Sequence, residues 1–231
     1  MIVFDPLYFL MAGPALLLAV YAQLKVKSSF ARWSRRPAGS GLTGARTARL
    51  ILDRFGLSEV PVERSGGWLS DHYDPRKRAL RLSPDVYDSP SVAAVGVAAH
   101  EAGHAIQHAT DYAPLKLRNA IVPTAQLGSW LAFPMLFIGM IFSIKGLALA
   151  GLILFTGLVV FQAITLPVEF NASNRAKKLI MDTGIISSAE EARGVASVLN
   201  AAALTYVAAT LAAVMQLLYF ALRLGLLRGD D

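Results

Sequence analysis

The sequence predicts a mainly α-helical integral membrane protein, with about four transmembrane helices and a small α+β domain between the first two. Apolar residue types make up 55% of the 231 residues and charged types only 16%, whereas soluble proteins carry roughly 25% charged residues. Four apolar runs lie at residues 7–24, 121–144, 147–168 and 201–222. Each run is close to the ~20 residues that span the hydrocarbon core of a bilayer.

The first apolar run is predicted to be an uncleaved anchor rather than a signal peptide. No lysine or arginine precedes it, and no clear small-residue cleavage site follows it. The chain contains no cysteine, so disulfides and thiolate metal sites are excluded. Any metal ion must be held by histidine, aspartate or glutamate.

Basic residues are concentrated on one side of this four-helix topology. One cluster follows the first run and another follows the third, whereas the opposite side has few basic residues. The clusters are Lys25, Lys27, Arg32, Arg35 and Arg36, then Arg175, Lys177 and Lys178, against Lys145, Arg223 and Arg228. The positive-inside rule therefore predicts that the clusters are cytoplasmic and that both termini face outward. We expect these cations to contact anionic lipid headgroups of the bilayer, and we expect no nucleic-acid partner.

These runs and charges predict five segments in chain order. They are a transmembrane anchor (1–25), a cytoplasmic domain (26–118), a transmembrane hairpin (119–168), cytoplasmic helices (169–200), and a final transmembrane helix with a C-terminal tail (201–231). Within the first cytoplasmic segment, Thr43 is expected to cap a helix that stops at Gly56. Residues 60–63 and 79–83 are typical of short strands. After the third run, Ser187 and Ser188 precede Glu190 and Glu191 by three residues, which predicts a capped helix leading into the fourth run.

The segment AAHEAGHAIQHA is the strongest functional signal. A capping serine in residues 88–91, with Pro90 at the first helical position, predicts a helix over residues 92–109. His100 and His104 then lie on one face of it, and Glu101 projects beside them. Two imidazoles that hold Zn²⁺ beside a nonligating glutamate base is the arrangement of zinc hydrolases, and this HExxH spacing is a known metalloprotease signature. Two histidines that are merely hydrogen-bonded on a helix surface are the alternative.

A catalytic zinc normally takes three protein ligands. His108 is excluded because eight helical residues rise about 12 Å from His100. Thr110 stands where the longer metzincin pattern continues, and it provides no histidine. Glu169 is the better candidate, because two membrane crossings return it to the side of the HEAGH helix. Its alternative role is an interfacial charge that pairs with Arg175 or Lys178.

Three segments, DHYDPRKRALRLSPDVY, AAHEAGHAIQH and EFNASNRA, resemble those of the YugP-type neutral zinc metallopeptidases, a family of bacterial membrane proteins. The resemblance runs from about Gly41 through the fourth apolar run. It implies a zincin-like domain and a gluzincin-like protease, with His100, His104 and Glu169 as zinc ligands and Glu101 as general base. Related membrane gluzincins carry Glu-x-x-x-Asp on the second helix. Because Ser173 stands at that aspartate position, we expect Ser173 or Asn174 to orient a zinc-bound histidine.

The expected substrate is an extended polypeptide, from a membrane or membrane-proximal protein, at the cytoplasmic surface of the cell membrane. The strand over 79–83, if it is a sheet edge, would pair with that substrate. His72 and Tyr73 are either donors to the oxyanion of the reaction or simple turn residues. The sequence gives no oligomeric state.

Two other functions compete with a surface protease. One is an intramembrane zinc protease, in which residues 92–109 themselves enter the bilayer, although three histidines, Glu101 and Gln107 make that costly. The other is a noncatalytic membrane scaffold with a structural zinc site.

Overall fold

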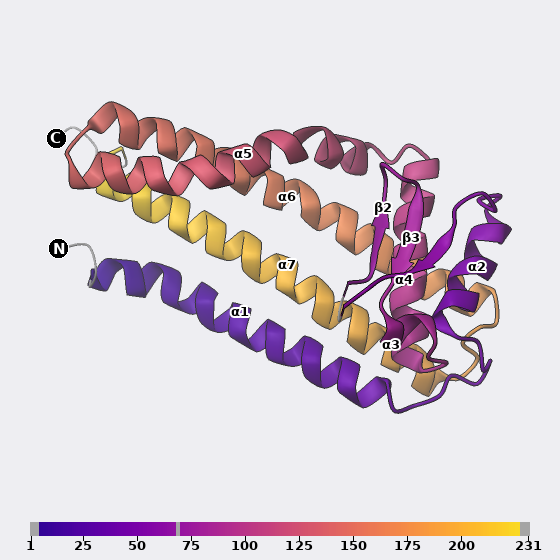
Figure 1. The fold of residues 1–231 in the computed structure, drawn as a ribbon. Helices are drawn as coiled ribbons and strands as arrows, with labels where there is room; N and C mark the ends of the chain where they lie inside the picture. Colours follow the sequence, from indigo (N-terminus) through magenta and orange to yellow (C-terminus); the bar gives the residue numbers. More distant parts are fainter. Residues whose placement is uncertain (1–4, 68–69, 227–231) are drawn as a thin grey trace. The chain divides into compact units, whose positions relative to one another are not determined.

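The computed structural model describes residues 5–67 and 70–226 of the chain (Figure 1). It divides into two compact units, each built from several stretches of sequence. The first unit comprises residues 1–22, 116–167 and 205–231, and the second comprises residues 23–115 and 168–204. All four of the long helices therefore begin in one unit and end in the other.

Four long helices dominate the described part of the chain. They are α1 (Pro6–Trp33), α5 (Ala113–Ile141), α6 (Lys145–Asp182) and α7 (Ala189–Arg223). All four are long and apolar enough to cross a membrane, which confirms the prediction of a mainly helical protein with four candidate spans. The helices extend well beyond the apolar runs. In particular, α6 continues without a break through Pro167, so that Glu169 lies on the same helix as the third run.

The first unit has an apolar interior and an apolar surface. Phe155 and Phe220 are buried in its core, whereas Leu10, Trp130 and Ile153 are each more than 70% exposed. Exposed side chains of this size are costly in water, and a lipid environment removes that cost.

The second unit contains the short elements α2 (Gly44–Arg54), α3 (Pro84–Tyr87) and α4 (Val92–Ala109), with a three-stranded sheet (Figure 1). The strands β1 (Val62–Arg64), β2 (His72–Asp74) and β3 (Ala79–Leu82) have the order β1-β3-β2. Strand β3 is parallel to β1 and antiparallel to β2. The strand near residues 79–83 is therefore central and not a sheet edge, so the condition under which it would pair with a substrate is not met, because β2 covers its second side.

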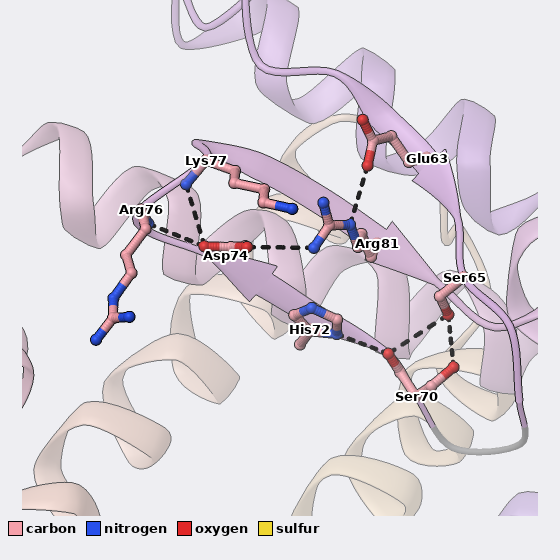
Figure 2. Close-up of polar contacts among 8 residues, drawn as sticks. All are labelled: Glu63, Ser65, Ser70, His72, Asp74, Arg76, Lys77 and Arg81. Carbon is pink, nitrogen blue, oxygen red and sulfur yellow. Dashed lines mark hydrogen bonds and ion pairs between the residues drawn. The ribbon is translucent and has the colours of Figure 1, made fainter. Parts of the chain in front are cut away.

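The two faces of this sheet differ in character. Arg81 Nε lies 2.9 Å from Glu63 Oε2 on β1, and its Nη1 lies 3.2 Å from Asp74 Oδ2 on β2. Figure 2 shows this row of charges across the three strands, and His72 lies on the same face. The opposite face carries the buried Leu80 and Leu82, which belong to the core around α4. Alternation along the strands thus separates a polar face from a core face.

Helix α4 lies at the centre of the second unit, with 14 of its 18 residues buried. The predicted caps of α2 and α4 are confirmed, since Thr43 accepts a hydrogen bond from the N–H of Arg46 and Ser91 accepts one from Ala94. Pro90, however, precedes the cap instead of occupying the first helical position, because Ser91 rather than Ser89 is the capping residue. The four candidate spans of the described residues do not include α4.

Candidate metal centre

Three side chains from α4 and α6 converge on one point inside the second unit. His100 Nε2 and His104 Nε2 are 3.2 Å apart. Glu169 Oε2 lies 3.3 Å from the first nitrogen and 3.5 Å from the second. We call His100, His104 and Glu169 the ligand cluster; they form a group that could hold a metal ion.

The ligand cluster fits a zinc ion in both spacing and electrostatics. Zinc–ligand bonds of ~2.0–2.1 Å in a tetrahedral site place neighbouring ligand atoms about 3.3 Å apart, close to the three separations observed. Glu169 is 3% exposed, and its Oε2 accepts no hydrogen bond from any described residue. Burying a carboxylate oxygen without a hydrogen bond is costly, and its two histidine neighbours carry positive charge only when protonated, so a cation between the three atoms would stabilise the arrangement.

The pKa of His104 is raised, which shows that the ligand cluster favours positive charge. Burial disfavours the imidazolium, but Glu169, Glu101 and Gln107 together outweigh burial and raise the pKa of His104. The interior beside Glu169 therefore stabilises positive charge, and a divalent cation would supply it.

Each histidine is oriented through its other ring nitrogen. Ser173 Oγ lies 3.2 Å from His100 Nδ1, whereas Asn174 is exposed. Of the two residues expected to orient a histidine, Ser173 is the one that the structure places there. His104 Nδ1 lies 3.0 Å from Gln107 Oε1, and because an amide oxygen only accepts, Nδ1 carries the proton. The lone pair of His104 Nε2 is then available to a metal.

Gln107 also connects the two helices that carry the ligands. It is fully buried, and its Nε2 donates to the carbonyl of Val168 at 2.8 Å and to Asn171 Oδ1 at 3.0 Å. Arg175 Nε donates to the same Asn171 oxygen at 2.8 Å. Arg175 is thus engaged with Asn171, and Glu169 does not pair with it. Sequence reasoning missed Gln107, although its position three residues after His104 was a usable signal.

Replacing Gln107 with methionine should weaken zinc binding by about 10–100-fold, the usual cost of losing a partner that orients a metal-bound histidine. Methionine fills a similar volume but cannot accept the proton of His104 Nδ1. Competition with a chelator of known affinity would measure the change. Gln126→Met is the matched control because Gln126 is exposed on α5. Equal zinc affinity in Gln107→Met and wild type would remove the orienting role.

Gly103 allows α4 and α6 to approach closely enough for the cluster to form. A Cβ at this position would stand 3.0 Å from the carbonyl oxygen of Ala172 and 3.4 Å from its Cα. The small residue inside HEAGH therefore has a packing role, because it lets the backbone that carries Glu169 come within reach of both histidines.

Glu101 lies beside the ligand cluster without joining it. It is 8% exposed, and its Oε2 accepts a hydrogen bond of 3.0 Å from the backbone N–H of Tyr73. Burial raises the pKa of Glu101, while the neighbouring His100 and His104 oppose the shift. A buried carboxyl group with a raised pKa, fixed by one backbone donor, has the properties of a general base or acid.

The two remaining candidates, His72 and Tyr73, differ in their positions relative to the ligand cluster. Tyr73 reaches the site through its backbone N–H, which donates to Glu101, whereas its hydroxyl lies 2.8 Å from His108 Nδ1. His72 is exposed on the polar face of the sheet, and its Nδ1 lies 2.8 Å from the carbonyl oxygen of Ser70 (Figure 2). Because adjacent strand residues point to opposite faces, His72 is not brought to the ligand cluster.

Together with the apolar helices of the first unit, this donor set defines a membrane protein whose metal centre is of the kind found in zinc hydrolases. The chain belongs to the family described as "putative neutral zinc metallopeptidase", whose model matches residues 8–225. It is 51% identical over 215 residues to a Bacillus subtilis (strain 168) protein named "Putative membrane protease YugP". The aligned residues cover 93% of this chain and 95% of that protein. No solved structure matches the chain.

Proposed function

We propose that this protein is a zinc-dependent membrane endopeptidase that hydrolyses polypeptides near the cytoplasmic surface of the membrane. The observation that carries the proposal is the ligand cluster, in which three donor atoms stand within 3.5 Å of one another beside the buried Glu101. The family and the name of the Bacillus relative support the same reaction class.

His100, His104 and Glu169 would hold the zinc, which supplies Lewis acidity that activates water and polarises the peptide carbonyl. Glu101 accepts a proton from the attacking water as the water oxygen bonds to the carbonyl carbon. It then passes that proton to the amine as the C–N bond breaks. The hydrogen bond from the N–H of Tyr73 keeps the Glu101 carboxylate in one position during both transfers.

The free edge of β2 is suited to bind an extended substrate. The N–H of Leu80 donates to Pro61 on the β1 side, so the backbone groups of Leu80 point away from its partner Tyr73. The N–H and C=O of Tyr73 therefore point away from β3, toward the open edge of the sheet. The N–H already donates a hydrogen bond to Glu101. The carbonyl of Tyr73 remains to accept a hydrogen bond from a substrate N–H, so we assign to β2 the pairing role that we expected of residues 79–83.

The distribution of charge supports the proposed cytoplasmic location, and the fold supports the proposed location at the membrane surface. Basic residues flank the chain segments that build the second unit, as expected of cytoplasmic segments. Helix α4 is not among the candidate spans and is buried among elements of its own unit. Both observations favour cleavage at the membrane surface over the intramembrane alternative.

Purified protein in detergent should cleave casein or an unstructured peptide, and a chelator should abolish cleavage. Substoichiometric to stoichiometric zinc should then restore it, because an HExxH centre without its ion lacks the Lewis acid. Release of new amino termini measures the reaction. Cleavage that persists unchanged after complete removal of metal would contradict the proposal, since it would come from another mechanism or a contaminant.

A further inference from the structure

A polar cavity opens next to Tyr73 within the second unit, and neither the metal centre nor the general base uses it. We call it the Tyr73 cavity, and its volume is about 350 Å³. Its lining includes Leu57, Glu59, Tyr73, Arg78, Ala105 and His108. This volume exceeds that of any single amino-acid side chain.

The Tyr73 cavity is connected to the catalytic groups by shared residues. The N–H of Tyr73 holds Glu101, while its hydroxyl contacts His108 in the cavity wall. Ala105 follows Glu101 by four residues and His108 follows it by seven, so the three lie on one face of α4. Seven helical residues rise about 10 Å, a distance that two or three residues of an extended peptide cover at ~3.3 Å each. A peptide held beside Glu101 therefore brings a nearby side chain to the cavity.

The charge and hydrogen-bonding groups of the cavity favour a cationic ligand group. Among the exposed lining residues, Glu59 and Asp111 carry negative charge and Arg78 carries one positive charge, and Asp111 already has an interaction of its own. Glu59 has no ion-pair partner among the described residues. The Tyr73 hydroxyl provides an acceptor deeper in the wall.

We propose that the Tyr73 cavity is a substrate subsite that binds a lysine or arginine side chain two or three residues from the scissile bond. This inference rests on the proposed peptidase function. Glu59 is its specificity-determining residue, and it acts by pairing with the substrate cation at the rim.

Peptide binding tests the subsite without requiring turnover. The zinc-loaded Glu101→Gln variant would be titrated with fluorescent eight-residue peptides that carry one lysine at successive positions, and with matched peptides that carry glutamate there. At one position, lysine should bind at least about tenfold more tightly than glutamate, as an exposed-to-half-buried charge contact allows. Adding Glu59→Gln should reduce that ratio to about threefold or less, whereas adding Glu190→Gln, at an exposed position on α7, should leave it unchanged.

Cleavage of the same peptides by the wild-type protein separates the two proposals. If the wild type cleaves the peptides but lysine never binds more tightly than glutamate, or Glu59→Gln leaves the ratio intact, the subsite is wrong and the peptidase function stands. If the lysine preference depends on Glu59 but no peptide is cleaved, the Tyr73 cavity does bind a cationic side chain, but the peptidase function fails and the cavity is not a substrate subsite. Absence of any peptide binding overturns the subsite.

Discussion

Replacing His104 or Glu169 with alanine is expected to reduce the zinc content of the purified protein from about one ion per chain to near background. Each substitution removes one of three protein ligands, and a zinc site with two ligands binds far more weakly than one with three. The Glu169 substitution has two causes of zinc loss: it removes a ligand, and it removes the buried negative charge on Oε2 that attracts the cation. Elemental analysis of detergent-purified protein after dialysis against trace zinc measures the loss.

Matched controls distinguish loss of a ligand from loss of the fold. His72→Ala removes a histidine that lies on the polar face of the sheet, and Glu190→Ala removes an exposed carboxylate. Both should keep about one zinc per chain, the stoichiometry of a three-ligand catalytic site. Circular dichroism and gel filtration should show the same helicity and size for all variants. Full zinc occupancy in Glu169→Ala would exclude Glu169 as the third ligand, and zinc loss in His72→Ala would return His72 to the site.

The parts of the site that sequence predicts well are those fixed by helical periodicity. His100 and His104 share a face of α4 because four residues make about one turn, and the capping serine of that helix is visible as well. Glu169 is sixty-five residues from His104, and it was suggested by the return of the chain through two membrane crossings and by the resemblance of the segment EFNASNRA. The close approach of Gly103 to Ala172 is what makes that long-range contact possible, and its distance cannot be computed from spacing along the chain.

The parts that sequence does not predict depend on strand pairing. Residues 72–74 are too short and too polar to show a strand pattern, since only Tyr73 is apolar among them. Their pairing with β3 decides which backbone groups reach Glu101 and which side chains face solvent. Although the two residues are adjacent in the chain, Tyr73 therefore contacts Glu101 and His72 faces solvent. Gln107 was missed because a buried glutamine has no periodicity of its own, and two of its three polar contacts, those with Val168 and Asn171, appear only when α6 is in place.

Replacing Glu101 with glutamine is expected to leave zinc bound and to lower kcat for peptide cleavage by about 10²–10⁴-fold, the usual contribution of a general base. Glutamine has nearly the same shape, and its amide oxygen can still accept the hydrogen bond from Tyr73 N–H that holds Glu101 in place. The fold and the ligand cluster should therefore persist, and only the proton transfer is lost. Zinc content, helicity and kcat measured on one preparation report on these three properties separately.

The same variant discriminates between a protease and a scaffold with a structural zinc site. A structural site has no use for a proton acceptor, so Glu101→Gln would preserve whatever cellular role the scaffold performs, and the wild type would cleave nothing. A protease should instead lose both cleavage and its cellular effect while retaining the metal, because Glu101 is 8% exposed and no surface carboxylate can replace it there. Glu190→Gln provides the matched substitution at an exposed position. Unchanged cleavage in Glu101→Gln would exclude Glu101 as the base, because no neutral amide can take up the proton that the reaction releases.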